Sequence, residues 1–151
     1  MPDVLTPHEV LARPANVFVA SFIGTPQMNL IEADLLRFGG DKASMRLAGN
    51  AVEIAADPAV SRLKPSKVTI GIRPRAFTPV PRKGKDTIAA QAELIEPMGA
   101  ETMVHARTTN GGEIRVVVPR EMRIKTAEAL HLSPDPKQTL FFDKDGRAVR
   151  A

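Results

Sequence analysis

Residues 29–54 read NLIEADLLRFGGDKASMRLAGNAVEI, and this stretch decides the fold class. Its apolar side chains recur at every second position in three runs, which is the period of a half-buried β-strand. Turn sequences at residues 39–41 (GGD) and 49–50 (GN) separate the runs. The pattern predicts a three-stranded meander with inward positions Ile31, Ala33, Leu35, Ala43, Met45, Leu47, Val52 and Ile54.

The same alternation extends to the end of the chain. Residues 110–112 (NGG) are a hairpin signal, whereas residues 78–86 hold prolines, a glycine and charges and are predicted to form a loop. We expect a mainly β chain of about eight or nine short strands in a barrel or a sandwich. Beyond the meander, the predicted strands cover residues 68–72, 88–95, 102–108, 114–118, 140–142 and 148–149.

The first 28 residues have a helical pattern, so we divide the chain into a junction segment, 1–28, and a β domain, 29–151. Thr6 and the proline after it predict the start of one short helix. A second is predicted over residues 15–23, ended by Gly24. Its apolar stripe consists of Phe18, Val19, Phe22 and Ile23.

The composition indicates one globular domain without covalent cross-links. The 151 residues are 43% hydrophobic and include no cysteine, which excludes disulfides and thiolate-bound zinc. No apolar run approaches the roughly 20 residues of a membrane-spanning helix, and no secretory signal pattern is present. The formal charge is +4, and the only dense basic stretch is Arg82, Lys83 and Lys85. We expect a soluble protein with a mildly basic surface.

No motif of an enzyme or a nucleotide site is found in the sequence. A G-x-x-x-x-G-K-[ST] loop is missing, and no strand leads into a G-x-G-x-x-G turn. The histidines are far apart, with His105 on a predicted strand and His131 in a predicted loop, so no metal site is expected. Glu96, Glu101 and Glu113 could approach one another across a hairpin, but their spacing does not indicate acid–base catalysis. We expect no catalytic residue, metal or cofactor in this chain.

Several stretches resemble the ATP-binding subunits of maltose- and glycerol-3-phosphate-type ABC importers. Residues 9–29 are similar to the junction between the nucleotide-binding and regulatory domains of that family. Later stretches agree in order and spacing, and the similarity covers nearly the whole chain. The stretches that carry it are RPAN (13–16), FVASFIGTP (18–26), GIRP (71–74), IEPMGAET (95–102), FFD (141–143) and GR (146–147).

The resemblance implies an OB-like barrel of the TOBE class with a non-catalytic regulatory and dimerisation role. ATP and Mg²⁺ would be bound by an ATPase domain outside these residues. The implied partners are a second copy of the subunit, membrane permease subunits and, in some members, a cytoplasmic regulatory protein, with no nucleic acid. The implied location is the cytoplasmic face of the cell membrane. The interface candidates are Arg73, Pro74, Arg75, Glu96, Pro97, Gly99, Glu101 and Thr102, and the junction-packing candidates are Phe18, Phe22, Ile23 and Gly24.

Two positions depart from the family pattern. Arg75 stands where glutamate is usual, and Thr139 stands near the usual histidine of the last motif. If the family glutamate makes an ion pair between domains or subunits, Arg75 calls that contact into question.

Two alternative functions stay open. TOBE-class barrels also occur in molybdate-handling proteins, and backbone N–H groups near Gly99 with the Thr102 hydroxyl would suit a small anion. A plain glycine turn explains the same residues. An OB-fold nucleic-acid binder stacks bases on aromatic side chains. The chain has six phenylalanines and no tryptophan or tyrosine, and core packing explains most of them.

Overall fold

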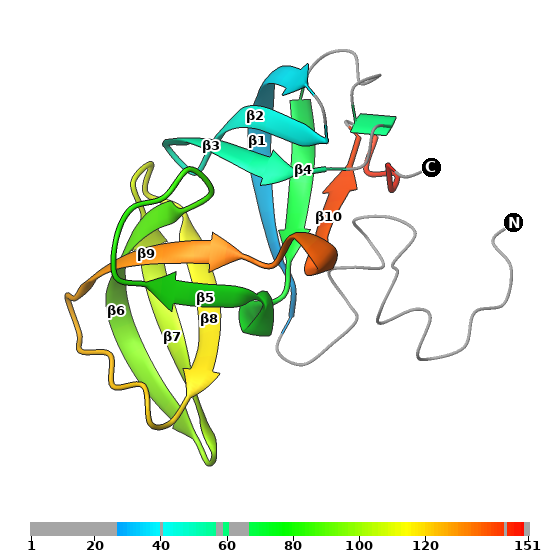
Figure 1. The fold of residues 1–151 in the computed structure, drawn as a ribbon. Helices are drawn as coiled ribbons and strands as arrows, with labels where there is room; N and C mark the ends of the chain where they lie inside the picture. Colours follow the sequence, from blue (N-terminus) through cyan, green and yellow to red (C-terminus); the bar gives the residue numbers. More distant parts are fainter. Residues whose placement is uncertain (1–26, 40, 57–58, 61–66, 144, 150–151) are drawn as a thin grey trace, which may run out of the picture.

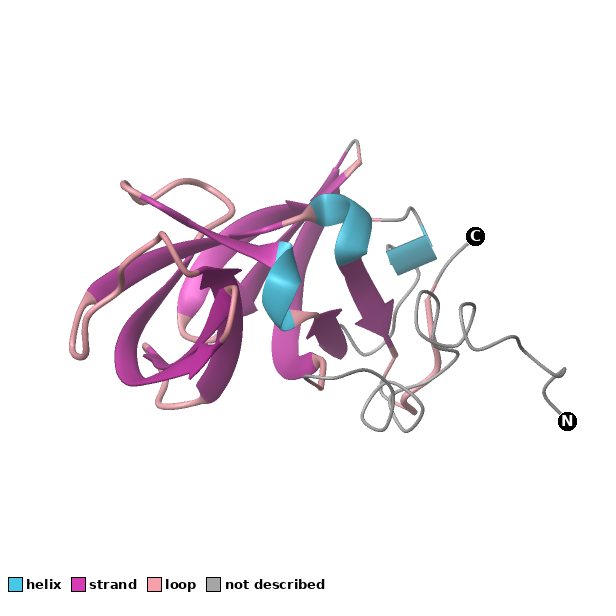
Figure 2. Cartoon of the chain, turned by 90° about the horizontal axis from the view of Figure 1, so that it is seen from below, coloured by secondary structure: helices cyan, strands magenta, loops and turns pink. Residues whose placement is uncertain are grey.

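The structure is a computed structural model, and it describes residues 27–39, 41–56, 59–60, 67–143 and 145–149. Nearly all of the regular structure in these residues is β-strand, with only short 3₁₀ turns (Figure 2). The two helices predicted before residue 28 lie outside the described residues, as do their candidates Phe18, Phe22, Ile23 and Gly24. No helix in the described part of the chain is long and apolar enough to cross a bilayer.

The first sheet contains the predicted meander. Its strand order is β10-β4-β1-β2-β3, and all neighbours are antiparallel. β1, β2 and β3 are consecutive in the chain and adjacent in the sheet, which confirms the prediction from residues 29–54. The strands are β1 (Asn29–Gly39), β2 (Lys42–Leu47), β3 (Asn50–Ala55), β4 (Lys67–Ile72) and β10 (Thr139–Phe142).

The second sheet is built from the middle of the chain. Its order is β5-β9-β6-β7-β8, again antiparallel, and its edge strands β5 and β8 approach each other. The predicted hairpin at residues 110–112 joins β7 to β8. The strands are β5 (Phe77–Val80), β6 (Ile88–Met98), β7 (Glu101–Thr108), β8 (Glu113–Pro119) and β9 (Ala129–Pro134).

Ten strands are described, more than the eight or nine predicted. β5 lies partly in the predicted loop, because Pro79 is tolerated in an edge strand that pairs only with β9. β9 was not predicted, although Leu130 and Leu132 alternate as buried residues. His131 therefore lies on a strand and not in a loop. Of the predicted strand 148–149, only an isolated bridge from Ala148 to Phe142 forms.

The chain crosses between the sheets at two 3₁₀ turns that lie side by side (Figure 1). The first, η2 (Pro74–Ala76), leads from β4 into β5, and the second, η3 (Pro136–Gln138), leads from β9 back to β10. The Asp135 N–H donates to the Ala76 carbonyl at 2.8 Å and ties the crossings together. The C-terminal strand therefore belongs to the first sheet.

Both sheets contribute to one main hydrophobic core. Met45 and Ile70 from the first sheet and Val104 and Leu132 from the second are fully buried in it. A smaller cluster lies on the other face of the first sheet, where Phe142 packs with Met28, Leu30, Leu140 and Ala148. The adjacent phenylalanines Phe141 and Phe142 are therefore both buried, one on each face, because both faces of β10 are covered.

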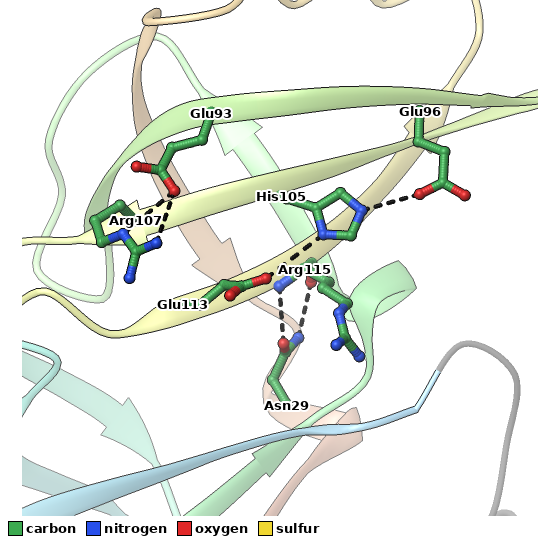
Figure 3. Close-up of polar contacts among 7 residues, drawn as sticks. All are labelled: Asn29, Glu93, Glu96, His105, Arg107, Glu113 and Arg115. Atoms are coloured by element: carbon green, nitrogen blue, oxygen red, sulfur yellow. Dashed lines mark hydrogen bonds and ion pairs between the residues drawn. The ribbon is translucent and has the colours of Figure 1, made fainter.

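Asn29 joins the first sheet to the edge of the second. Its Nδ2 donates to the Arg115 carbonyl at 2.8 Å and to the Ile72 carbonyl at 3.1 Å, while its Oδ1 accepts from the Arg115 N–H at 2.8 Å. Figure 3 shows the two bonds with Arg115. The buried side-chain amide thus pairs with the open edge of β8 as a neighbouring strand would.

Candidate functional site

An ion pair brings two of the family-motif stretches together. Arg75 lies in η2, directly after β4, and Glu101 is the first residue of β7. The Arg75 guanidinium donates to the Glu101 carboxylate from Nη2 at 2.8 Å and from Nε at 3.1 and 3.3 Å. The forked guanidinium matches the planar carboxylate, so this is the stronger, bidentate type of pair. Arg75, at the position of the departure from the family pattern, thus has a partner within its own domain.

The pair changes the ionisation of both side chains. Hydrogen bonds from Arg75, with a smaller electrostatic contribution, hold the pKa of the Glu101 carboxyl below its usual range. The same hydrogen bonds raise the pKa of Arg75. Both side chains stay substantially exposed, at 51% and 39%, so salt and water weaken their attraction.

The Glu101→Gln variant, which lacks the carboxylate of the ion pair, should be less stable than the parent by an amount that depends on pH. A carboxyl whose pKa is lower in the folded state stabilises the fold above the unfolded-state value, about 4.3, and loses this contribution as the pH falls through the folded value. We expect the variant to unfold at a lower urea concentration than the parent at pH 7. The gap should narrow from pH 5 towards pH 3, and a gap that stayed constant over this range would contradict the assignment.

The turn between β6 and β7 brings Gly99 next to the ion pair. Gly99 has φ +82°, and Met98 pairs with Glu101 across the turn. A positive φ at the first of two turn residues is typical of a type II′ hairpin, where glycine is preferred. The Ala100 carbonyl accepts from the Arg120 N–H at 3.0 Å and anchors the turn to the chain after β8. These features support a structural turn.

Gly99→Ala is expected to lower the free energy of unfolding by about 1–2 kcal/mol. No atom lies within 4 Å of an added Cβ, so the whole cost comes from the positive φ. Gly39→Ala is the matched control, because its Cβ also meets nothing within 4 Å and its φ is not positive. Urea unfolding of both variants tests this, and equal losses would show that the backbone conformation is not the cause.

The other interface candidates lie around this turn or on β6. Arg73 is half-buried, and burial lowers the pKa of its guanidinium, while Pro74 is buried in η2. Pro97 is exposed and pairs with Thr102, which is half-buried. The Glu96 side chain points away from this turn, because one of its carboxylate oxygens contacts Nε2 of His105 on β7.

A ladder of charged side chains crosses the outer face of β6, β7 and β8 (Figure 3). His105 Nε2 lies 3.0 Å from a Glu96 carboxylate oxygen, and its Nδ1 lies 3.6 Å from one of Glu113. A neutral imidazole donates from one ring nitrogen, whereas a protonated one donates from both and would face a carboxylate on each side. Next to it, Arg107 donates to Glu93 at 2.9 and 3.2 Å.

The three glutamates that the sequence places near this hairpin lie in two separate places. Glu96 and Glu113 flank His105, whereas Glu101 is held by Arg75. Their spacing in the sequence suggests a single group of three glutamates, and the structure separates Glu101 from the other two. The described residues contain no group of three or more side chains suited to hold a metal ion.

Comparison with protein families supports the resemblance seen in the sequence. Residues 70–142 match the profile of the TOBE domain. This segment, just under half of the chain, is therefore similar to a TOBE domain. The matched segment runs from the centre of β4 to the end of β10, so it includes both crossings, the whole second sheet and all the interface candidates.

Over nearly its whole length, the chain is also similar to transport ATP-binding proteins. It is 33% identical to the sn-glycerol-3-phosphate import ATP-binding protein UgpC of Bordetella avium, over 96% of this chain and 39% of the relative. It is also 33% identical to the sulfoquinovosyl glycerol transport ATP-binding protein SmoE of Agrobacterium fabrum, over 93% of this chain and 38% of the relative. The chain spans less than two-fifths of the length of these relatives.

The fold of this chain is also similar to that of a solved structure with low sequence identity. The cytoplasmic molybdate-binding protein ModG matches with a TM-score of 0.61 at 12% identity, over 75% of this chain and 94% of that one. This likeness supports the OB-like β fold predicted from the sequence.

Proposed function

We propose that this chain is the non-catalytic regulatory and dimerisation part of the ATP-binding subunit of an ABC importer for sugars or related solutes. The observation that carries the proposal is the 33% identity to UgpC and SmoE over nearly the whole chain. The 1–28 junction would connect an ATPase domain, which binds ATP and Mg²⁺, to the β domain. The assembled subunit would work at the cytoplasmic face of the membrane with its permease partners.

The proposed regulatory and dimerisation role needs a stiff contact surface and no active site. A domain that touches its twin biases an open–closed equilibrium only by the difference in contact energy between the two states. The bidentate Arg75–Glu101 pair and the anchored β6–β7 turn supply such a surface, since both fix exposed side chains relative to the two sheets.

The in-frame coding sequence upstream of Met1 tests the assignment to an importer subunit. The proposal expects a P-loop, a signature helix and a Walker B strand there. A genuine start at Met1 with no ATPase coding sequence before it would overturn the assignment.

The contact surface is tested in the full-length subunit by exchanging the charges of the pair. Arg75→Glu combined with Glu101→Arg keeps an ion pair within the domain but reverses its polarity. If the surface takes part in dimerisation, the exchange should weaken the dimer measured by sedimentation while leaving the unfolding midpoint nearly unchanged. An unaltered dimer would remove this surface from the interface.

The small-anion alternative depends on the turn at Gly99. The hydrogen bond from Arg120 to Ala100 and the tight hairpin geometry favour a structural role for this turn. Calorimetric titration with molybdate, sulfate and a sugar phosphate separates the two readings. We expect no heat of binding, and saturable binding that Gly99→Ala weakens would support the alternative.

A further inference from the structure

The two sheets repeat one strand pattern. In the first sheet, β1, β2 and β3 form a meander, and β4 returns to pair with β1. In the second sheet, β6, β7 and β8 form the meander, and β9 returns to pair with β6. β1 and β6 have 11 residues each, and β4 and β9 have 6 each. The chain therefore contains two halves of the same design, a first half (residues 29–80) and a second half (residues 88–142).

The strand registers of the two halves agree as well. The pairing of β1 with β2 shifts directly after the pair Leu35–Met45, and that of β6 with β7 shifts directly after Ala92–Ala106. Met45 and Ala106 each lie two positions before the last residue of their strand. A bulge is a specific local feature that sheet pairing does not require, so its recurrence at one place supports a common design.

Each half gives its last strand to the sheet of the other half. β5 follows η2 in the chain but pairs with β9, and β10 follows η3 but pairs with β4 (Figure 1). The register is the same in both cases. The first residue of the exchanged strand pairs with the last residue of its neighbour, Phe77 with Pro134 and Thr139 with Ile72. Each sheet is therefore completed by a strand from the other half.

The exchanged strands also pack the halves together. Phe77 of β5 and Phe141 of β10 are both buried in the main core, which the two sheets share. Phe142 packs with Met28 and Leu30 at the start of the first half. The covalent connection between the halves is the segment 81–87, and its residues up to Lys85 are exposed. Strand pairing and core packing thus hold the halves together independently of this connection.

We propose that the edges of β4 and β9 are binding surfaces whose partner is the complementary half of this fold, taken from the same chain or from a second copy. Each edge receives a strand of four residues by main-chain pairing, and buried phenylalanines fix its position. A second copy offers the same strands and the same apolar side chains. Exchange of identical elements between copies is a known route to dimers.

Cutting the connection in the complete chain is the first test. A recognition sequence for a site-specific protease is inserted between Lys83 and Gly84, which are exposed, and the folded protein is cleaved there. We expect the two halves to sediment together with the mass of the uncut protein. Separation of the halves in native buffer would overturn the proposal.

A mixing experiment tests the second copy as the source of the partner. Cut chains with an N-terminal affinity tag are unfolded in urea with untagged, isotope-labelled cut chains, and the mixture is refolded. We expect the tag to capture labelled second halves as readily as unlabelled ones. Capture of unlabelled halves alone, or pairing of second halves with one another, would contradict the proposal.

The control for mixing is a disulfide across an exchanged strand. Thr78→Cys combined with Ser133→Cys changes two residues that pair between β5 and β9, in a chain without other cysteines. Antiparallel partners are about 4.5–5.5 Å apart at Cα, which a disulfide can span. The oxidised, tagged variant should keep its own second half and capture no labelled one. A bridge that fails to join the halves would show that β5 does not lie beside β9.

Phe142→Ala tests whether β10 holds the halves together. In the cut chain we expect the dissociation constant of the two halves, measured by sedimentation, to rise about tenfold or more. Leu94→Ala is the control, because Leu94 is 56% exposed and lies on neither exchanged strand. It should change the constant by less than about twofold. Equal effects of the two variants would contradict the role of β10.

Discussion

Replacing Phe142 with alanine is expected to lower the free energy of unfolding by about 3–5 kcal/mol. The side chain is fully buried on the face of the first sheet that is turned away from the main core, against Met28, Leu30 and Leu140. β10 is a four-residue edge strand, so its pairing with β4 depends heavily on the packing of its side chains. Urea unfolding followed by circular dichroism measures the loss.

Phe38→Ala is the control for the loss of an aromatic ring. Phe38 is only partly buried and packs at the edge of the main core, so its truncation removes less contact area. We expect a loss of about 1–2 kcal/mol. Equal losses at the two positions would show that the cluster around Phe142 contributes no more than a surface contact.

Gly71 provides a second probe of the same cluster. A Cβ at this position would lie 2.5 Å from the sulfur of Met28, closer than packed atoms tolerate, and 3.0 Å from Phe142 Cε2, which is a tight contact. Gly71→Ala should therefore cost about 1–3 kcal/mol by overpacking. In the Phe142→Ala background the ring is gone, and the cost should fall. A double-mutant cycle measures this coupling, and strictly additive losses would contradict the contact.

Asn29→Asp should destabilise the fold by about 3 kcal/mol. In the parent, Nδ2 of the buried amide donates to two carbonyl oxygens, those of Ile72 and Arg115. In the variant, a carboxylate oxygen replaces Nδ2 and faces the two carbonyl oxygens. Both hydrogen bonds are therefore replaced by repulsive contacts between acceptors in a poorly hydrated site. The destabilisation should decrease at low pH, where a protonated carboxyl donates one hydrogen bond.

Asn110→Asp is the matched control for this change. Asn110 is exposed, and its side-chain oxygen accepts from the Thr108 hydroxyl and the Gly112 N–H. A carboxylate keeps both of these bonds, so we expect a change within about 0.5 kcal/mol. If both variants lost the same stability, the donor role of Asn29 in joining the sheets would be wrong.

The alternation of apolar residues predicted most strands because each has one face in the core. It failed where the position of a strand in the sheet, or a shift of register, determines the structure in place of the local alternation. Pro79 argued against a strand, yet β5 is an edge strand and needs no hydrogen bond from that position. In β6, an irregularity between Ala92 and Leu94 shifts the register and leaves Leu94 56% exposed. No local sequence pattern predicts such a shift of register.

The candidate site could be predicted only as separate stretches. The family resemblance marked Arg75 and Glu101, but their contact depends on how η2 packs against the second sheet. Residues 26 positions apart and on different elements have no periodic relation that reveals such a contact. In the same way, Lys42 of β2 and Lys85 of the β5–β6 loop line one groove although they are far apart in the sequence, and no sequence pattern reveals this.

The paired crossings at η2 and η3 give the chain the organisation of one module inserted into another. The first sheet contains both the earliest and the latest described strands, and the second occupies the interval between them, with its two ends joined at the Ala76–Asp135 hydrogen bond. Neighbouring ends are the arrangement in which an insert can be lengthened, shortened or exchanged without disturbing its host. The second sheet, with its exposed charged ladder, can therefore diversify during evolution, while truncation before β10 would leave it whole and open the first sheet instead.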